Sequence, residues 1–278
     1  MTNQDEKTGN GFQPITELAN GLSNLGRFFE KIRIDTALLA QVVNTDWKAV
    51  KKRIDSLPTR SREATGIASA QGWFFNWQRS FKETWHLIES LNNAKDADAV
   101  DEILKAHYTQ NIDWYTNLLV GLYPERKEVI EAAITAHKSY ASQGYYLSVP
   151  VFLAQADGIL SEISGVDMPM STRDGSTKGG SWVSSQIGDN KSAKQLLDQM
   201  LNLHTMDILK TQKQREEDTK SGKVFNALNR HQVMHGEVSN YGTELNSLKA
   251  LSLLIFIGAH VPEILETARC WDGDPLDE

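Results

Sequence analysis

The chain has 278 residues, of which 40% are hydrophobic and 23% are charged, and its formal net charge is −7. This length and composition predict a globular protein with one large or two small domains. The single cysteine excludes an internal disulfide and a cysteine-rich zinc site. The acidic balance argues against a broadly basic nucleic-acid-binding surface, although a small cationic site remains compatible with it.

No basic segment followed by an apolar one is present at the N-terminus, so no signal peptide is predicted. The longest apolar stretch, residues 251–259, is far shorter than the roughly 20 residues that a membrane span requires. It is interpreted as a buried helix of a cytoplasmic protein, and no membrane association is expected.

Apolar residues recur at helical spacing along most of the chain, which predicts an all-α fold, a bundle of about seven to nine helices. Helices are predicted over 15–44, 46–56, 61–92, 97–120, 125–142, 145–164, 191–218, 223–235 and 244–267. Asp46, Asp98 and Thr243 are expected to cap helices, and Pro58 to end one. Pro124 fits a first helical turn, whereas Pro150 predicts a helix start or a kink.

Three kinds of segment interrupt this pattern. Residues 1–12 are polar and predicted to be disordered, and residues 269–278 form a tail. Residues 165–190, rich in glycine and serine, are expected to form an irregular loop between the helices. Its segment 174–180 fails the phosphate-loop pattern, because neither the Gly-Lys-Ser/Thr spacing nor a preceding strand is present.

The charged stretch 210–220 is interpreted as a solvated helix face, and the aromatic stripe in 61–92 as core packing.

The chemistry of the chain is predicted to centre on Arg230-His231-Gln232-Val233-Met234-His235. Since a helix turns about 100° per residue, His231 and His235 lie on nearly one face and Arg230 flanks them. Gly236 is expected to end the helix and leave His235 at an accessible edge. Histidine can accept and donate protons near neutral pH, and arginine binds phosphate oxygens, so the pattern suits metal-independent phosphodiester cleavage.

Three other interpretations of this segment remain open. In the first, Arg230 pairs with a carboxylate and the histidines stabilise a helix C-terminus. In the second, His231 and His235 bind zinc with His204 or Glu237 as a third ligand, although Gln232 replaces the glutamate that zinc proteases place after the first histidine. In the third, the site binds an anion or nucleotide without turnover.

The segment resembles the Arg-polar-x-x-x-His motif of the HEPN superfamily (higher eukaryotes and prokaryotes nucleotide-binding domains). An extended pattern is similar to that of a group of uncharacterised bacterial HEPN-like proteins, and the resemblance covers about residues 140–268. The segments that carry this wider pattern are 146–150, 155–158, 229–236, 240–243 and 246–250. The resemblance divides the chain into an N-terminal helical region, 13–142, whose role it does not indicate, and a HEPN-like helical core, 143–268.

Membership of this superfamily implies a metal-independent endoribonuclease without a cofactor, acting in phage defence or toxin-type growth control. It also implies a homodimer with a composite site and an RNA substrate, and it allows for a neutralising or regulatory protein. By the resemblance, Arg230 binds the scissile phosphate, His235 is the acid–base residue and His231 supports it. Four further residues are expected to support this site: Asp157, Glu162, Asn229 and Tyr241.

One departure from the superfamily narrows the implied function. Toxins paired with nucleotidyltransferase antitoxins carry a tyrosine two residues after the motif histidine, where this chain has Glu237. That subgroup is therefore not expected. Many members of the superfamily are also catalytically silent, so a non-catalytic nucleotide-binding, RNA-binding or protein-interaction module is the alternative.

Overall fold

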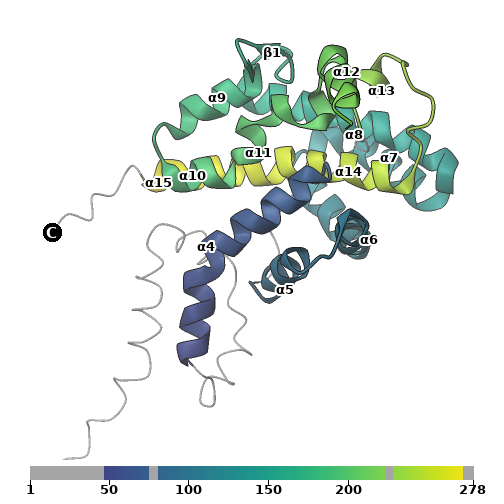
Figure 1. Ribbon diagram of the computed structural model, residues 1–278. Coiled ribbons are helices and arrows are strands. Elements are labelled where there is room, and N and C mark those ends of the chain that lie inside the picture. Colours follow the sequence, from purple (N-terminus) through teal and green to yellow (C-terminus); the bar gives the residue numbers. More distant parts are fainter. Residues whose placement is uncertain (1–46, 75–80, 223–227, 272–278) are drawn as a thin grey trace, which may run out of the picture.

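The computed structural model describes residues 47–74, 81–222 and 228–271, which fold almost entirely into helices (Figure 1). The predicted all-α fold is confirmed, since the described part has only two strands, each of two residues, and they pair as one hairpin. The longer α-helices are α4 (Trp47–Ala70), α5 (Phe81–Asn92), α6 (Ala97–Leu122), α7 (Lys127–Ser139), α8 (Ala141–Ser164), α9 (Lys178–Ile187), α12 (Gln212–Lys220), α14 (Glu244–Ile255) and α15 (Val261–Trp271). Shorter elements are η2 (Pro124–Arg126), β1 (Thr172–Arg173), β2 (Ser176–Thr177), α10 (Lys191–Leu196), α11 (Asp198–Leu201), η3 (Leu203–Thr205), η4 (Asp207–Leu209), α13 (Arg230–Met234) and η5 (Phe256–His260).

Helix α14 lies at the centre of the molecule, and every residue from 247 to 255 is buried. A helix that is buried on all sides packs against neighbours on all sides, and α6 and α8 both contact α14. Helix α7 in turn packs along α8. The predicted boundary between residues 142 and 143 falls inside α8, just after its start at Ala141, and one hydrophobic core includes residues from both regions.

The predicted helix 244–267 is present, but η5 interrupts it as a single π-helical turn between α14 and α15. The Gly258 carbonyl accepts a hydrogen bond of 2.8 Å from the hydroxyl of Tyr123, the C-cap residue of α6. Burial raises the pKa of this tyrosine to about 12. In the described residues, Glu244–Ala268 is the one helix long and apolar enough to cross a membrane, yet 89% of its most apolar window is buried inside the protein.

Two N-terminal helix predictions are wrong. Helix α4 continues past Pro58, because Leu57, Ser61, Ala64 and Ala68 form one buried stripe that outweighs the lost backbone hydrogen bond. The predicted helix 61–92 is broken after Ala70 by a turn at Gly72, whose φ is +77°. The predicted helix 15–44 lies outside the described residues, and so does Asp46, the predicted cap of the helix 46–56.

The predicted loop 165–190 and helix 191–218 also need correction. The loop contains the β1–β2 hairpin and α9, whose N-cap is Thr177. Glycines in α9 permit close packing: a Cβ atom at Gly179 would lie 2.8 Å from Leu160 Cδ2. Residues 191–218 are divided among α10, α11, η3, η4 and α12, so the described residues hold more helices than the seven to nine predicted.

The predicted caps have mixed outcomes. Thr243 caps α14 as expected, by accepting from the Asn246 backbone N–H. The cap of α6 is Asp96, and Asp98 lies in its first turn. Pro124 opens the 3-10 turn η2, which leads into α7. Pro150 lies inside α8, which begins nine residues earlier at Ala141.

Candidate functional site

The motif forms the short helix α13, which begins at Arg230. Of the predicted helix 223–235, residues 228 and 229 are not helical and residues 223–227 lie outside the described residues. Its N-cap is Asn229, whose side-chain oxygen accepts from the Gln232 backbone N–H at 3.1 Å. The same amide donates to the backbone oxygens of Asp207 and Lys210, at 2.8 and 2.9 Å. Because Asn229 is only 3% exposed, these bonds fix the start of α13 to η4.

The other end of α13 is closed by a backbone motif that requires glycine. Gly236 has φ of +69° and donates to the Val233 oxygen, while the Glu237 N–H donates to the Gln232 oxygen at 2.8 Å. These two bonds define a Schellman motif with His235 as the C-cap residue. The predicted helix end at Gly236 is confirmed. The turn brings Glu237 back toward α13.

Arg230 is anchored by a carboxylate on α8. Its Nη2 lies 2.7 Å from Asp157 Oδ2, and the two side chains are 23% and 24% exposed. Within the described ranges, Arg230 Nε and Asp157 Oδ1 are buried without hydrogen-bond partners, so the pair is held through one nitrogen and one oxygen. This contact orients the arginine beside the histidines.

Glu162, the second acidic residue considered for this role, pairs with a different arginine. Its Oε2 lies 3.0 Å from Arg126 Nη2, and Gln155 accepts from Arg126 Nη1 at 2.8 Å. The guanidinium covers Gly158, where a Cβ atom would lie 2.9 Å from Nη1. Glu162 therefore ties η2 to α8, and the carboxylate brought to Arg230 is Asp157.

The two histidines are exposed and adjacent. Their ring centroids are 4.4 Å apart with an interplanar angle of 53°, and the His231 side chain is 54% exposed. Nε2 of His231 lies 3.0 Å from Oε1 of Glu237. The predicted placement of both rings on one face is confirmed, and both are accessible from solvent.

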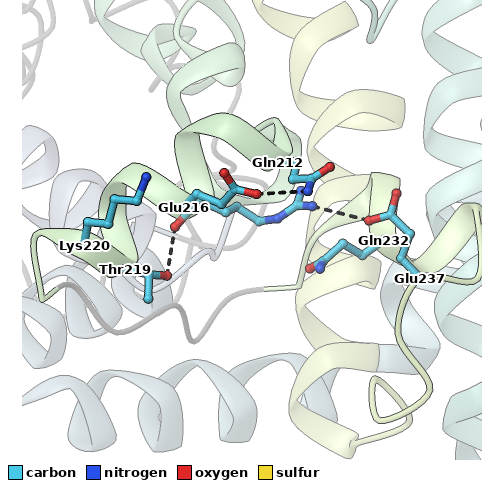
Figure 2. A pocket seen from close by; sticks show the side chains of 7 residues that line it. Gln212, Glu216, Thr219, Lys220, Gln232 and Glu237 are labelled. Atoms are coloured by element: carbon cyan, nitrogen blue, oxygen red, sulfur yellow. Dashed lines mark hydrogen bonds and ion pairs between the residues drawn. The ribbon is translucent and has the colours of Figure 1, made fainter.

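A buried arginine, Arg215, contacts the same glutamate as His231. Arg215 on α12 is 9% exposed, and its Nη2 lies 3.4 Å from Glu237 Oε2. Its Nη1 donates to the Lys210 backbone oxygen at 2.8 Å and to Asn229 Oδ1 at 3.1 Å. An open pocket of about 620 Å³ borders these groups (Figure 2). It is lined by Gln212, Arg215, Glu216, Thr219, Lys220, Gln232 and Glu237.

Tyr241 fixes the turn after α13 to α8. Its hydroxyl donates to the Tyr146 backbone oxygen at 3.4 Å, and the two rings meet edge to face with centroids 5.2 Å apart. That oxygen would ordinarily accept from residue 150, but Pro150 has no N–H. Tyr241 thus binds the carbonyl that the proline leaves without a helical donor.

Sequence reasoning missed the role of Arg215, because its stretch was interpreted as a solvated face. That interpretation is wrong for this residue, which points inward from an otherwise charged and mostly exposed helix. Glu237 was considered only as a metal ligand and as a departure from the superfamily. The two residues are 22 positions apart in the sequence, so no local pattern indicates the contact between Arg215 and Glu237.

Metal coordination was one of the open interpretations of the histidines. In the part of the chain that the structure describes, no group of three or more histidine, cysteine, aspartate or glutamate side chains is arranged to hold a metal ion. Glu237, one candidate for the third zinc ligand, lies 3.0 Å from His231 Nε2, but His231, His235 and Glu237 do not form such a group. His204, one of the two candidates, lies in η3.

Comparison of the chain with models of known families, with curated proteins and with solved structures gave no match.

Proposed function

We propose that the protein is a metal-independent endoribonuclease whose site is formed by Arg230, His231 and His235. The observation that carries this proposal is the contact of two exposed histidine rings, 4.4 Å apart, beside an arginine held in place by Asp157. One ring can accept a proton while the other donates one, and the guanidinium can bind a phosphate oxygen.

The reaction that suits these groups uses the substrate's own nucleophile. One histidine removes the proton of the ribose 2′-hydroxyl, and the 2′-oxygen forms a new bond to phosphorus. The bond from phosphorus to the 5′-oxygen breaks, and the second histidine protonates that leaving oxygen. The products are a 2′,3′-cyclic phosphate and a 5′-hydroxyl. Arg230 stabilises the negative charge that builds on the phosphoryl oxygens.

Purified protein incubated with mixed single-stranded RNA in the presence of EDTA tests the proposal. The wild type is expected to cleave, and His235→Ala to lose at least about 100-fold in rate, because a positioned acid–base group contributes about 10²–10⁴-fold. His86→Ala, at an exposed histidine on α5, is the matched control. Absence of cleavage by the wild type, or equal cleavage by His235→Ala, would contradict the proposal.

The proposal extends to a homodimer in the cytoplasm in which two copies of α13 face each other. Exposed apolar side chains support it: Met234 on α13 is 40% exposed, and Tyr146 and Leu147, near the start of α8, are 40% and 59% exposed. Sedimentation of the wild type and of Met234→Glu tests this step. The substitution is expected to yield monomers and to reduce cleavage together, and a wild-type monomer that cleaves RNA would contradict it.

A non-catalytic binding module is the second candidate. The charge balance within the site favours it, since Asp157 pairs with Arg230 and Glu237 pairs with Arg215. Such compensation reduces the positive charge available to phosphate. Under this alternative, the protein binds RNA or a nucleotide with no turnover, and Arg230→Ala weakens binding while His235→Ala leaves it unchanged.

A further inference from the structure

Glu237 connects an exposed histidine to a buried arginine. Its Oε1 lies 3.0 Å from His231 Nε2, and its Oε2 lies 3.4 Å from Arg215 Nη2. The backbone N–H of Glu237 is itself held by the Gln232 oxygen in the turn that ends α13. The carboxylate is therefore held at both of its oxygens and the backbone of the residue is held by the turn, although the side chain is 40% exposed.

The arginine on the far side of Glu237 is rigidly placed. Arg215 donates to the Lys210 oxygen and to the side chain of Asn229, the same residue that caps α13. Movement of Arg215 would therefore disturb both the helix start and the carboxylate. A buried charged side chain such as Arg215 orients its partner, here the Glu237 carboxylate, more firmly than a mobile surface side chain can.

The chemistry of the contact determines the state of the imidazole. An ionised carboxylate can only accept hydrogen bonds, so His231 Nε2 must carry the proton that joins it to Glu237. In a neutral ring the other nitrogen, Nδ1, then holds the lone pair. A histidine without such a partner exchanges between both tautomers, and a fraction of its molecules presents the wrong nitrogen.

We infer that Glu237 is a positioning residue that fixes His231 as the Nε2–H tautomer and thereby makes Nδ1 the nitrogen that exchanges protons with substrate. Arg215 holds Glu237 in the required orientation. This inference rests on the proposed function for its catalytic meaning, but the tautomer is a property of the free protein. It specifies the nitrogen through which His231 takes the part in proton transfer that the proposed function gives it, where the superfamily resemblance gives this residue only a supporting part.

Nitrogen-15 NMR of the full chain with labelled histidine tests the inference without any RNA. At a pH where the ring is neutral, His231 is expected to show the Nε2–H pattern, with its signals identified by their loss in His231→Ala. Glu237→Ala should convert them to the averaged pattern of a free ring, whereas Glu237→Gln, which keeps an acceptor oxygen, should preserve Nε2–H. Glu217→Ala, at an exposed carboxylate on α12, should change nothing.

Two NMR results would overturn the inference. One is an Nδ1–H or averaged pattern for His231 in the wild type, and the other is an unchanged Nε2–H pattern in Glu237→Ala. The cleavage rate gives the second readout: Glu237→Ala is expected to lose about ten- to a hundredfold, with recovery in Glu237→Gln. A wild type that does not cleave RNA contradicts the proposed function alone, since the tautomer pattern still decides the role of Glu237.

Discussion

The histidines of this protein occupy two contrasting environments. His231 and His235 lie exposed at the end of a five-residue helix, whereas His137 and His260 lie inside the bundle and are 7% and 0% exposed. Burial lowers the pKa of His137, and it lowers the pKa of His260 to about 4. The buried rings stay neutral near pH 7 and are closed off from solvent, whereas the rings of the exposed pair are open to it, as the proposed proton exchange requires.

Among the ion pairs, those in the interior are expected to affect the free energy of unfolding more than those on the surface. Lys249 is 2% exposed, with Nζ 3.1 Å from Asp101 Oδ1, which also accepts from Trp73 Nε1 at 2.7 Å. Asp101→Ala leaves this lysine buried without its counter-charge and should lower the free energy of unfolding by about 3–5 kcal/mol. Chemical denaturation measures the change. Asp113→Ala, which removes an exposed partner of Lys138, should stay within experimental error; similar losses for both variants would contradict the contrast between interior and surface.

The buried His260 is expected to make stability depend on pH. Its folded pKa of about 4 lies below the ordinary 6.5, so the unfolded chain binds the proton more tightly. Its contribution is therefore complete above pH 6.5 and is lost as the pH falls toward 4, by about 3 kcal/mol in total. Denaturation of wild type and His260→Met between pH 4 and 7.5 isolates this contribution, and an identical slope in both proteins would exclude it.

The exposed site is expected to respond in rate and not in stability. Arg230→Lys keeps the positive charge but loses the planar set of donors, so RNA cleavage should fall about tenfold while the unfolding free energy changes little. Arg126→Lys, on the other arginine that pairs with α8, is the control and should cleave like the wild type. Full activity of Arg230→Lys would show that charge alone is sufficient.

The smallest effect is expected at the turn that ends α13. Gly236→Ala places a side chain at φ of +69° and should cost about 1 kcal/mol of stability. Gly121→Ala, inside α6 with no atom within 4 Å of the added Cβ, should be neutral or stabilise by up to about 1 kcal/mol. Thermal denaturation of both variants compares them, and equal shifts would show that the turn does not need glycine.

The local features of the site could be predicted from the sequence. Helical periodicity placed His231 and His235 on one face, and Gly236 marked the end of α13, because both depend on residues within one turn. The partners of the site could be predicted only in part. Asp157 was one of two candidates separated by 140° on α8, and only the packing of α13 on α8 selects it.

The errors in the fold have a common physical origin. Pro58 and the glycines of α9 were interpreted by their intrinsic preference for breaking helices, yet a buried stripe and close interhelical packing outweigh that preference. Arg215 was assigned to the surface because its neighbours are charged. In each case the deciding contact comes from residues far away in the sequence, which periodicity and propensity do not report.

The π-helical turn η5 lets the chain hold one additional residue at this point without turning α15 away from its neighbours. Such a turn holds one residue more than an α-helical turn, so deletion of one residue between Phe256 and His260 would let an ordinary helix form. Because the π-helical turn completes one rotation with one residue more, α15 would keep its orientation after this deletion, and the buried side chains of Ile264 and Leu265 would keep the neighbours that cover them. The expected consequence is that loss of one residue within η5 preserves the contacts of α15 with α9 and α10.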